Sequence, residues 1–181
     1  MNIFVLDNDP VIAARYMCDK HVGKMIIESG QMMASVLRHY GATDEQMPLT
    51  ATSKKPWRGG WPNHPCTRWV MESQSNFTWL WSHAMGLGME FKKRYGKTHA
   101  CVEAVDEMHT MLLFMNDYPD VGLTPFAQAM PDECKDDDAV KAYRRYYSTE
   151  KKDIAKWQRG TVAPWWMYPC EKPDLFTGLN A

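Results

Sequence analysis

Apolar residues recur at steps of three and four along the first part of the chain, the spacing of one face of a helix. The pattern begins after Asp9 and Pro10, an acidic capping residue followed by a proline, which is typical of a first helical turn. It continues to Tyr40, and Gly41 suits the position just after a helix. The sequence therefore predicts a helix over residues 10–40, with a buried face made of Val22, Met25, Ile26, Met32, Met33, Val36 and Leu37.

A second helix is predicted between Pro65 and Gly96, because proline favours a first turn and glycine a helix end. Apolar and aromatic residues spread around most of its circumference, which is typical of a central, buried helix. These residues include Trp69, Val70, Phe77, Leu80, Trp81, Met85, Leu87 and Phe91.

Two further helices are predicted over residues 100–115 and 138–160 from the same periodicity. The short apolar stretch 2–6 is interpreted as an N-terminal arm or a strand stub. No strand-like alternation occurs elsewhere in the chain. We therefore expect an all-α protein with a single compact domain over residues 1–181, built from about four helices, with an aromatic tail at 161–181 that contains Trp165, Trp166 and Tyr168.

Residues 41–62 have no helical period and are predicted to form a long loop. Loops of more than about 15 residues inside a compact domain are usually functional or disordered. This one is basic with aromatic residues interleaved: Lys54, Lys55, Trp57, Arg58 and Trp61. The alternative interpretation is a solvated loop whose tryptophans fold back on the core.

Composition excludes several classes of protein. The chain has 181 residues and 45% hydrophobic residues, and its five cysteines are an odd and scattered set, which suggests reduced thiols. No apolar run approaches the roughly 20 residues needed to cross a bilayer, and the N-terminus reaches Asp7 too soon for a signal peptide. We therefore expect a cytoplasmic protein without a membrane partner.

The formal net charge of −1 hides a segregation of charge along the chain. The predicted helix 138–160 carries seven basic residues, whereas acidic residues gather around 103–107, 116–120 and 132–138. A locally basic face can follow DNA phosphates even on a nearly neutral protein. The alternative is an ordinary solvated helix face.

A polar stripe flanks the apolar face of the first predicted helix. His21, Lys24, Glu28 and Gln31 follow one another at helical spacing and would point the same way. A carboxylate at the edge of a core can have a raised pKa and act in acid–base chemistry. The alternative is a boundary stripe with a Lys–Glu helix pair.

Metal and cofactor chemistry find little support in the sequence. Cys18 with His21, or His99 with Cys101, is not half of a standard zinc spacing with a matching second half. Gly59 and Gly60 precede no Lys-Ser/Thr helix, so they do not form a phosphate-binding P-loop. We expect neither a metal nor a cofactor.

The stretch MCDKHVGKMIIESGQ resembles the first long helix of the pyrimidine-dimer DNA glycosylase/AP-lyase family of T-even phages. That helix carries Asp-x-His and, seven residues after the His, the active-site Glu; Asp19, His21 and Glu28 stand at these spacings here. His64 before an aromatic-rich run also resembles the family. Further similarities are Glu150-Lys151, Ile154-Ala155 and the aromatic segment 164–168. The chain is similar as well to uncharacterised small proteins of tailed phages.

The resemblance implies an all-α domain that needs no metal and acts on double-stranded DNA with a damaged or modified base. It implies that an N-terminal amine attacks the sugar C1′ to form a Schiff base while Glu28 assists. His21 is the other catalytic candidate, beside Met1. The candidate substrate-binding residues are Lys24, Gln31, His64, Lys151, Trp165 and Trp166.

The sequence departs from the family pattern at several positions. Asn2 follows Met1, a poor context for removing the initiator methionine, so the amine is expected to belong to Met1. Ile27 and Gln31 replace two family arginines, and the strongly basic overall charge is absent. Two alternatives therefore stay open: a glycosidase that acts on a small nucleotide, and a non-enzymatic phage protein that sequesters a nucleotide or a host protein in the host cytoplasm.

Overall fold

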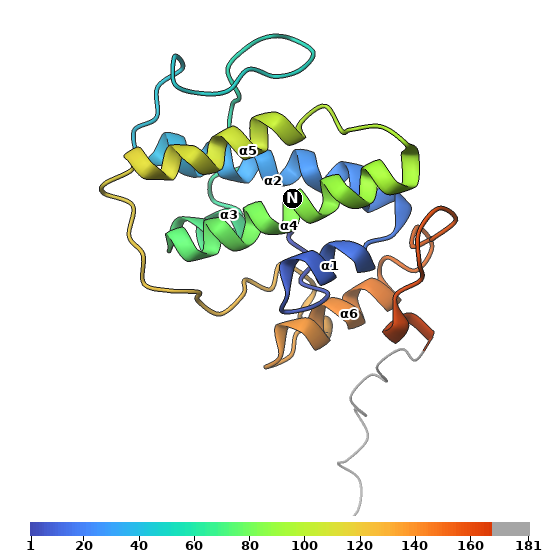
Figure 1. The fold of residues 1–181 in the computed structure, drawn as a ribbon. Coiled ribbons are helices and arrows are strands. Elements are labelled where there is room, and N and C mark those ends of the chain that lie inside the picture. Colours follow the sequence, from blue (N-terminus) through green and yellow to red (C-terminus); the bar gives the residue numbers. More distant parts are fainter. Residues whose placement is uncertain (168–181) are drawn as a thin grey trace, which may run out of the picture.

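The computed structural model describes residues 1–167, which form one compact all-α body (Figure 1). The described residues contain no β-strand, and Leu49 and Pro56 form an isolated bridge. Three short 3₁₀ helices accompany the α-helices: η1 (Met111–Phe114), η2 (Asp132–Cys134) and η3 (Pro164–Met167). The α-helices are α1 (Pro10–Tyr16), α2 (Asp19–His39), α3 (Pro65–Met71), α4 (Gln74–Tyr95), α5 (Val102–Thr110) and α6 (Ala139–Thr149).

The all-α prediction is confirmed, but the prediction of about four helices is wrong because the first two predicted helices are each broken. Met17 and Cys18 are extended and separate α1 from α2. Ser73 is extended at the start of α4, where its side chain accepts a hydrogen bond from Ser75 N. Such a break leaves the apolar period of three and four unchanged, so the sequence pattern does not show it.

The other two predicted helices are shorter than expected. The helix expected over 100–115 is α5 followed by η1, and the helix expected over 138–160 ends at Thr149. After α6 the chain turns back to the start of α2, where Asp19 N donates to Lys156 O at 2.9 Å. These contacts between distant segments compete with continuation of the helix.

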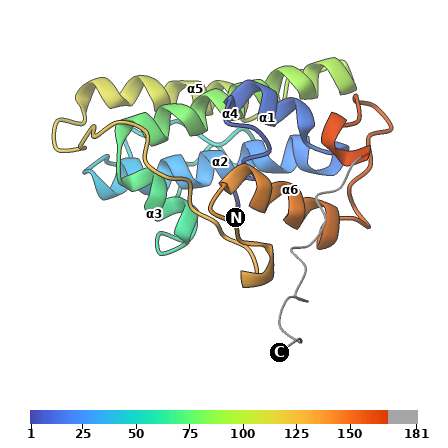
Figure 2. The ribbon, with the colours of Figure 1, turned by 90° about the horizontal axis from the view of Figure 1, so that it is seen from below.

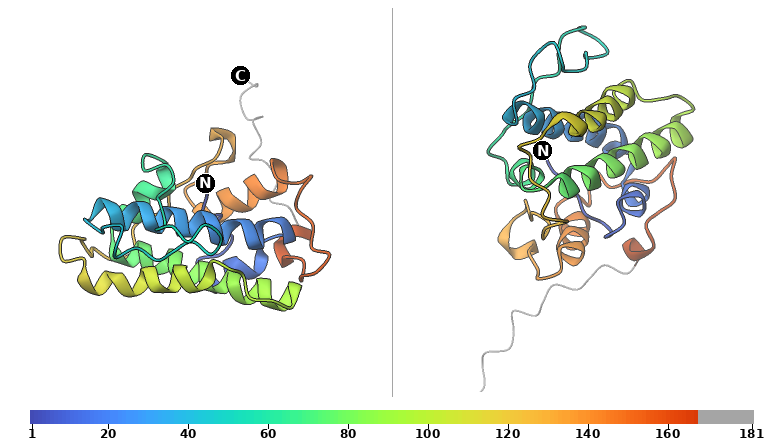
Figure 3. Two further views of the ribbon diagram at one scale, coloured as in Figure 1. Left: turned by 90° about the horizontal axis from the view of Figure 1, so that it is seen from above. Right: turned by 60° about the vertical axis from the view of Figure 1, so that its left-hand side comes forward.

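The helices α2 and α4 pack against each other, and α5 packs against both (Figure 1). On another side, α1 packs closely on α4 because Gly86 has no side chain. A Cβ added at Gly86 would lie 2.9 Å from Ala14 Cβ. Residues 40–64, which contain no helix, lie on the outer side of α2 and α5 (Figure 3).

The N-terminal arm is buried rather than free. Ile3, Phe4, Val5 and Leu6 all belong to the core, and Arg144 of α6 donates to Leu6 O at 2.9 Å. The chain therefore begins between α2 and α6 (Figure 2). This placement brings Met1 to the polar stripe of α2.

The sequence also predicts that the protein has no membrane partner and that its cysteines are reduced thiols. No helix within residues 1–167 is long and apolar enough to cross a membrane. The four cysteines in this part of the chain, Cys18, Cys66, Cys101 and Cys134, are free thiols. Tyr168 and Cys170 lie outside the described residues.

The buried His83 on α4 makes stability depend on pH. Its ring is stacked on Trp79, and neither ring nitrogen has a hydrogen-bond partner among the described residues. Burial lowers the pKa of His83 to about 3. Below about pH 6.5 the unfolded chain gains a proton at this residue that the folded protein does not, so acid favours unfolding.

We expect His83→Phe to unfold less readily in acid than the wild type. As the pH falls from about 7.5 to about 5, the wild type should lose about 2 kcal/mol of unfolding free energy relative to the variant. Urea denaturation at both pH values measures this difference. If the two proteins differ in unfolding free energy by the same amount at both pH values, His83 is protonated equally in the folded and unfolded states.

Candidate active site

The polar stripe of α2 lines a cavity of about 210 Å³ between α2, the N-terminal arm and the end of α6. Five of the nine residues predicted from the sequence to bind or react lie here together, and four of them come from the first part of the chain: Met1, His21, Lys24 and Glu28. Lys151, from the far end of the chain, is the fifth. The wall is completed by Asn2, Phe4, Met25, Tyr146 and Ile154.

Glu28 is the carboxylate of this cavity, and its side chain is 13% exposed. Its Oε2 accepts a hydrogen bond from Asn2 N at 3.0 Å and lies 3.8 Å from the α-amine of Met1. Its Oε1 lies 3.3 Å from Lys24 Nζ. The carboxylate is therefore held between the chain terminus and a lysine one helical turn away.

Asn2 fixes the first residues of the arm. Its Oδ1 accepts from the backbone N–H groups of Ile3 and Phe4, and its Nδ2 donates to Ala129 O at 2.8 Å. Phe4 has a positive φ of 38°, which is rare for a residue with a side chain and is maintained only where the surroundings impose it. The arm thus holds the terminal amine in one place.

His21 is a neutral imidazole at physiological pH. Its ring stacks on Phe4 with centroids 4.7 Å apart, and its Nδ1 lies 2.7 Å from the hydroxyl of Tyr147. Burial, followed by the charges of Lys24 and Lys151, lowers the pKa of His21 to about 4. It can therefore donate or accept a hydrogen bond at the cavity but carries no charge toward a phosphate.

Lys151 reaches the cavity from the turn that follows α6. Its Nζ lies 4.7 Å from the centre of the Tyr146 ring, a favourable cation–π contact. The Tyr146 ring is in turn stacked on Phe4. A second cation thus lies near Glu28 in space although it is more than a hundred positions away in sequence.

Gln31 and His64 lie beside this cavity rather than in its wall. Gln31 O accepts a hydrogen bond from Gly60 N at 3.1 Å. His64 caps α3 by accepting from Cys66 N, and burial together with the charge of the chain terminus lowers its pKa. Both residues border the same end of the arm as Met1.

Trp165 and Trp166 are half-buried and do not line the cavity. Their rings lie edge-on to Tyr147, with centroids 6.1 and 6.3 Å away. Trp165 also contacts Tyr16, and Arg144 lies over its ring. The two tryptophans therefore support Tyr147, the hydroxyl partner of His21.

Several residues that shape the cavity were not predicted from the sequence. Asn2 and Phe4 lie in the segment interpreted as an arm, and Tyr146 lies in the helix predicted over residues 138–160. Tyr147 lies in the same predicted helix, where its spacing from other apolar residues favours a core position, but nothing in that spacing indicates that its hydroxyl meets His21. The two short stretches that meet here, 2–4 and 146–151, are too far apart in sequence for a local pattern to connect them.

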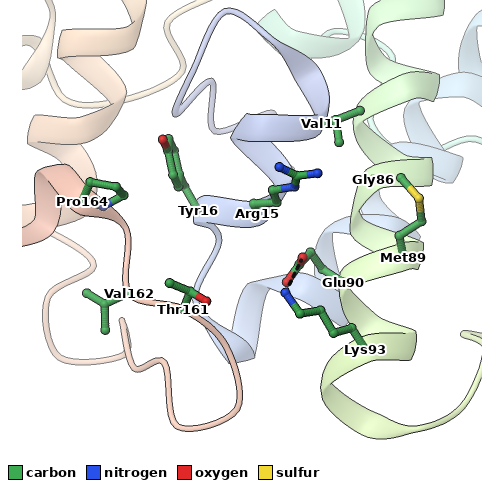
Figure 4. A pocket seen from close by; sticks show the side chains of 10 residues that line it. All are labelled: Val11, Arg15, Tyr16, Gly86, Met89, Glu90, Lys93, Thr161, Val162 and Pro164. Carbon is green, nitrogen blue, oxygen red and sulfur yellow. Dashed lines mark ion pairs between the residues drawn. The ribbon is translucent and has the colours of Figure 1, made fainter.

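A larger cavity, of about 450 Å³, lies between α1, α4 and residues 161–164. Figure 4 shows Arg15 and Tyr16 from α1 on one side of this cavity and Glu90 and Lys93 from α4 on the other, with an ion pair of 3.6 Å between Glu90 and Lys93. It contains none of the residues predicted to form a site. No cluster of three or more potential metal-ligating side chains occurs within residues 1–167.

The family model of pyrimidine dimer DNA glycosylases matches residues 1–104. The chain belongs to this family. The match includes the arm, α2 with Glu28, and His64, but it ends before the helix that carries Tyr146 and Tyr147. Membership suggests DNA glycosylase activity on damaged bases. No curated protein and no solved structure matches the chain.

We expect Tyr147→Phe to destabilise this glycosylase-family protein by about 2 kcal/mol. The loss of the hydroxyl would leave His21 Nδ1 and Cys18 N without a buried partner, and each such group costs about 1–3 kcal/mol. Urea denaturation measures the effect.

The matched control is Tyr146→Phe. Its ring packs on the same Phe4, and its hydroxyl has no hydrogen bond within the described residues. Equal stability of the two variants would rule out a stabilising role for the Tyr147 hydroxyl.

Proposed function

We propose that this protein is a phage DNA glycosylase that cleaves the N-glycosidic bond of a damaged or modified base in double-stranded DNA. The observation that carries the proposal is the meeting of the chain terminus with Glu28 in a cavity. The family membership supports the same reaction class. The cavity is bordered by Lys24 and Lys151, which suits the negative charge of nearby phosphates.

The reaction would run through covalent catalysis by the terminal amine. The amine nitrogen forms a bond to C1′ of the sugar, the bond from C1′ to the base breaks, and the base leaves with the electron pair and takes up a proton. The nitrogen then loses its protons, the C1′–O4′ bond breaks with its electron pair going to O4′, and O4′ takes up a proton, which leaves an imine between the nitrogen and C1′. Glu28 would accept and return these protons, which its closeness to both nitrogens supports. In a lyase step, it would remove the C2′ proton as the 3′ phosphate leaves.

Two forms of the chain terminus can supply the amine. With Met1 retained, its α-nitrogen lies 3.8 Å from Glu28 Oε2. With Met1 removed, the primary amine would be the Asn2 nitrogen, which lies 3.0 Å from the same oxygen. Either form brings a primary amine to the carboxylate, and the residue carrying a trapped adduct distinguishes them.

The other predicted residues are assigned roles by their positions. His21, as a neutral imidazole, would donate or accept a hydrogen bond to the sugar or base. Lys24 and Lys151 would bind phosphate at the cavity edge. Gln31 and His64 would contact the nucleotide on the side of the arm. Trp165 and Trp166 would act through the packing of Tyr147.

We expect borohydride to trap a covalent adduct between the protein and a duplex that contains a base lesion or an abasic site. Peptide mapping by mass spectrometry should place the adduct on the first residue of the chain. Glu28→Gln should lower the rate of base release by about 10²–10⁴-fold, because that is the usual contribution of a general acid–base group.

Glu103→Gln is the matched control, because Glu103 is an exposed carboxylate in the first turn of α5. Acetylation of the terminal amine should abolish trapping. Full activity of Glu28→Gln would exclude its assigned role. No adduct and no released base from any lesion or phage-modified duplex would instead favour a protein that binds a nucleotide or a host protein.

A further inference from the structure

Residues 55–61 cross the outer face of α2 as a strap. Gly60 N donates to Gln31 O, and Trp57 N donates to Pro48 O at 2.9 Å. At Gly59 the strap comes so close that an added Cβ would lie 2.8 Å from Ser35 Cα. The strap therefore lies directly on the helix that carries Glu28.

Trp57 attaches the strap to α2. Its side chain is 5% exposed and fills the space above Gly30, where an added Cβ would lie 2.7 Å from the indole ring. Arg38 donates two hydrogen bonds to Trp57 O, at 3.0 and 2.8 Å, and is itself paired with Asp44. The backbone of the strap is thus held in place before any ligand binds.

The side chains on the outer face of the strap are charged or aromatic. Lys55 and Arg58 are exposed and have no ion-pair partner within residues 1–167. Trp61 is 62% exposed, and its ring lies edge-on to His64 with centroids 5.6 Å apart. Exposing the apolar ring of Trp61 to water is unfavourable, and this ring and the two neighbouring cations contribute little to the stability of the fold.

Lys55 and Arg58 border a second groove, of about 540 Å³, which lies against α2. The groove is also lined by Ile27, which immediately precedes Glu28, and by Gln31, which follows it by three positions. Gly60 adjoins the arm, since an added Cβ would lie 2.6 Å from Met1 Sδ. Because Ile27 and Gln31 are uncharged, the positive charge in this groove comes from the strap.

We propose that the strap binds the DNA strand beside the reacting nucleotide. Lys55 and Arg58 would hold backbone phosphates, and Trp61 would stack on a base exposed next to the reaction site. The proposal rests on the proposed glycosylase function and adds the residues that hold the substrate. Phosphate contacts and stacking have different salt dependences, so the two roles can be measured separately.

The experiment measures binding of the full-length chain to a fluorescent duplex with a tetrahydrofuran abasic-site analogue, which cannot form an imine. Affinity is followed by anisotropy over a series of salt concentrations. The double variant Lys55→Ala, Arg58→Ala should lower the slope of log affinity against log salt concentration by about 2, since each phosphate contact contributes about 0.9. Trp61→Ala should weaken binding about tenfold with an unchanged slope.

Lys92→Ala and Phe114→Ala are the matched controls, an exposed cation in the last turn of α4 and an exposed aromatic residue in η1. Unchanged thermal unfolding of all variants, whose changed side chains are exposed, shows that they are folded. The proposal is overturned if the salt slope of the Lys55→Ala, Arg58→Ala variant falls no more than that of Lys92→Ala. It is also overturned if Trp61→Ala binds the duplex as tightly as Phe114→Ala does.

The outcomes separate this inference from the proposed function. If the protein releases a base and the strap variants have the same salt slope as the wild type, the proposed glycosylase function stands and the strap is excluded as its DNA contact. Strap-dependent binding without base release or adduct on any lesion would keep the DNA contact and exclude the glycosylase. A chain that binds no duplex overturns the strap proposal outright.

Discussion

The buried guanidinium of Arg94 holds the segments from which the site is built. It donates to Arg15 O and Met17 O at the break between α1 and α2, and it pairs with Asp19 and Glu90. Removing it would leave two carboxylates without their buried partner, which is strongly destabilising. Because Asp19 is the first residue of α2, this cluster sets where α2 begins and therefore which way Glu28 points. Asp19 also accepts from two backbone N–H groups at 158–159, so the same cluster fixes the return of the chain after Lys151.

The positive charges near Glu28 are a local feature of a protein whose net charge is close to zero. Arg144 and Arg145, which in the sequence belong to a basic helix, are engaged with the arm and with Asp136. They hold the fold rather than presenting charge to a ligand. The cations near Glu28 come instead from Lys24 on α2 and from Lys151 beyond α6. Net charge is therefore a poor guide to this surface, because it averages structural and exposed cations.

The sequence was informative where the determining interactions are local. The spacing of His21, Lys24 and Glu28 predicted that they share a helix face, and the structure places all three at one cavity. The capping by Asp9 is likewise local. The break at Met17 and Cys18 was missed because Arg94 and Tyr147 satisfy its backbone groups from far along the chain. For the same reason, the roles of Asn2 and Tyr147 could not be predicted: their partners are Ala129 and His21.

The burial of the arm limits the time during which enzymes can modify the N-terminus. Asn2 is tied to Ala129, and Phe4 packs on Tyr146 and Tyr147, so the arm cannot dock until α6 has left the ribosome. At about 5–20 residues per second, the first residues remain accessible for on the order of ten seconds. Any aminopeptidase or acetyltransferase must act in that interval. The chemical identity of the terminal amine beside Glu28 is thus set during translation, before the cavity around it has formed.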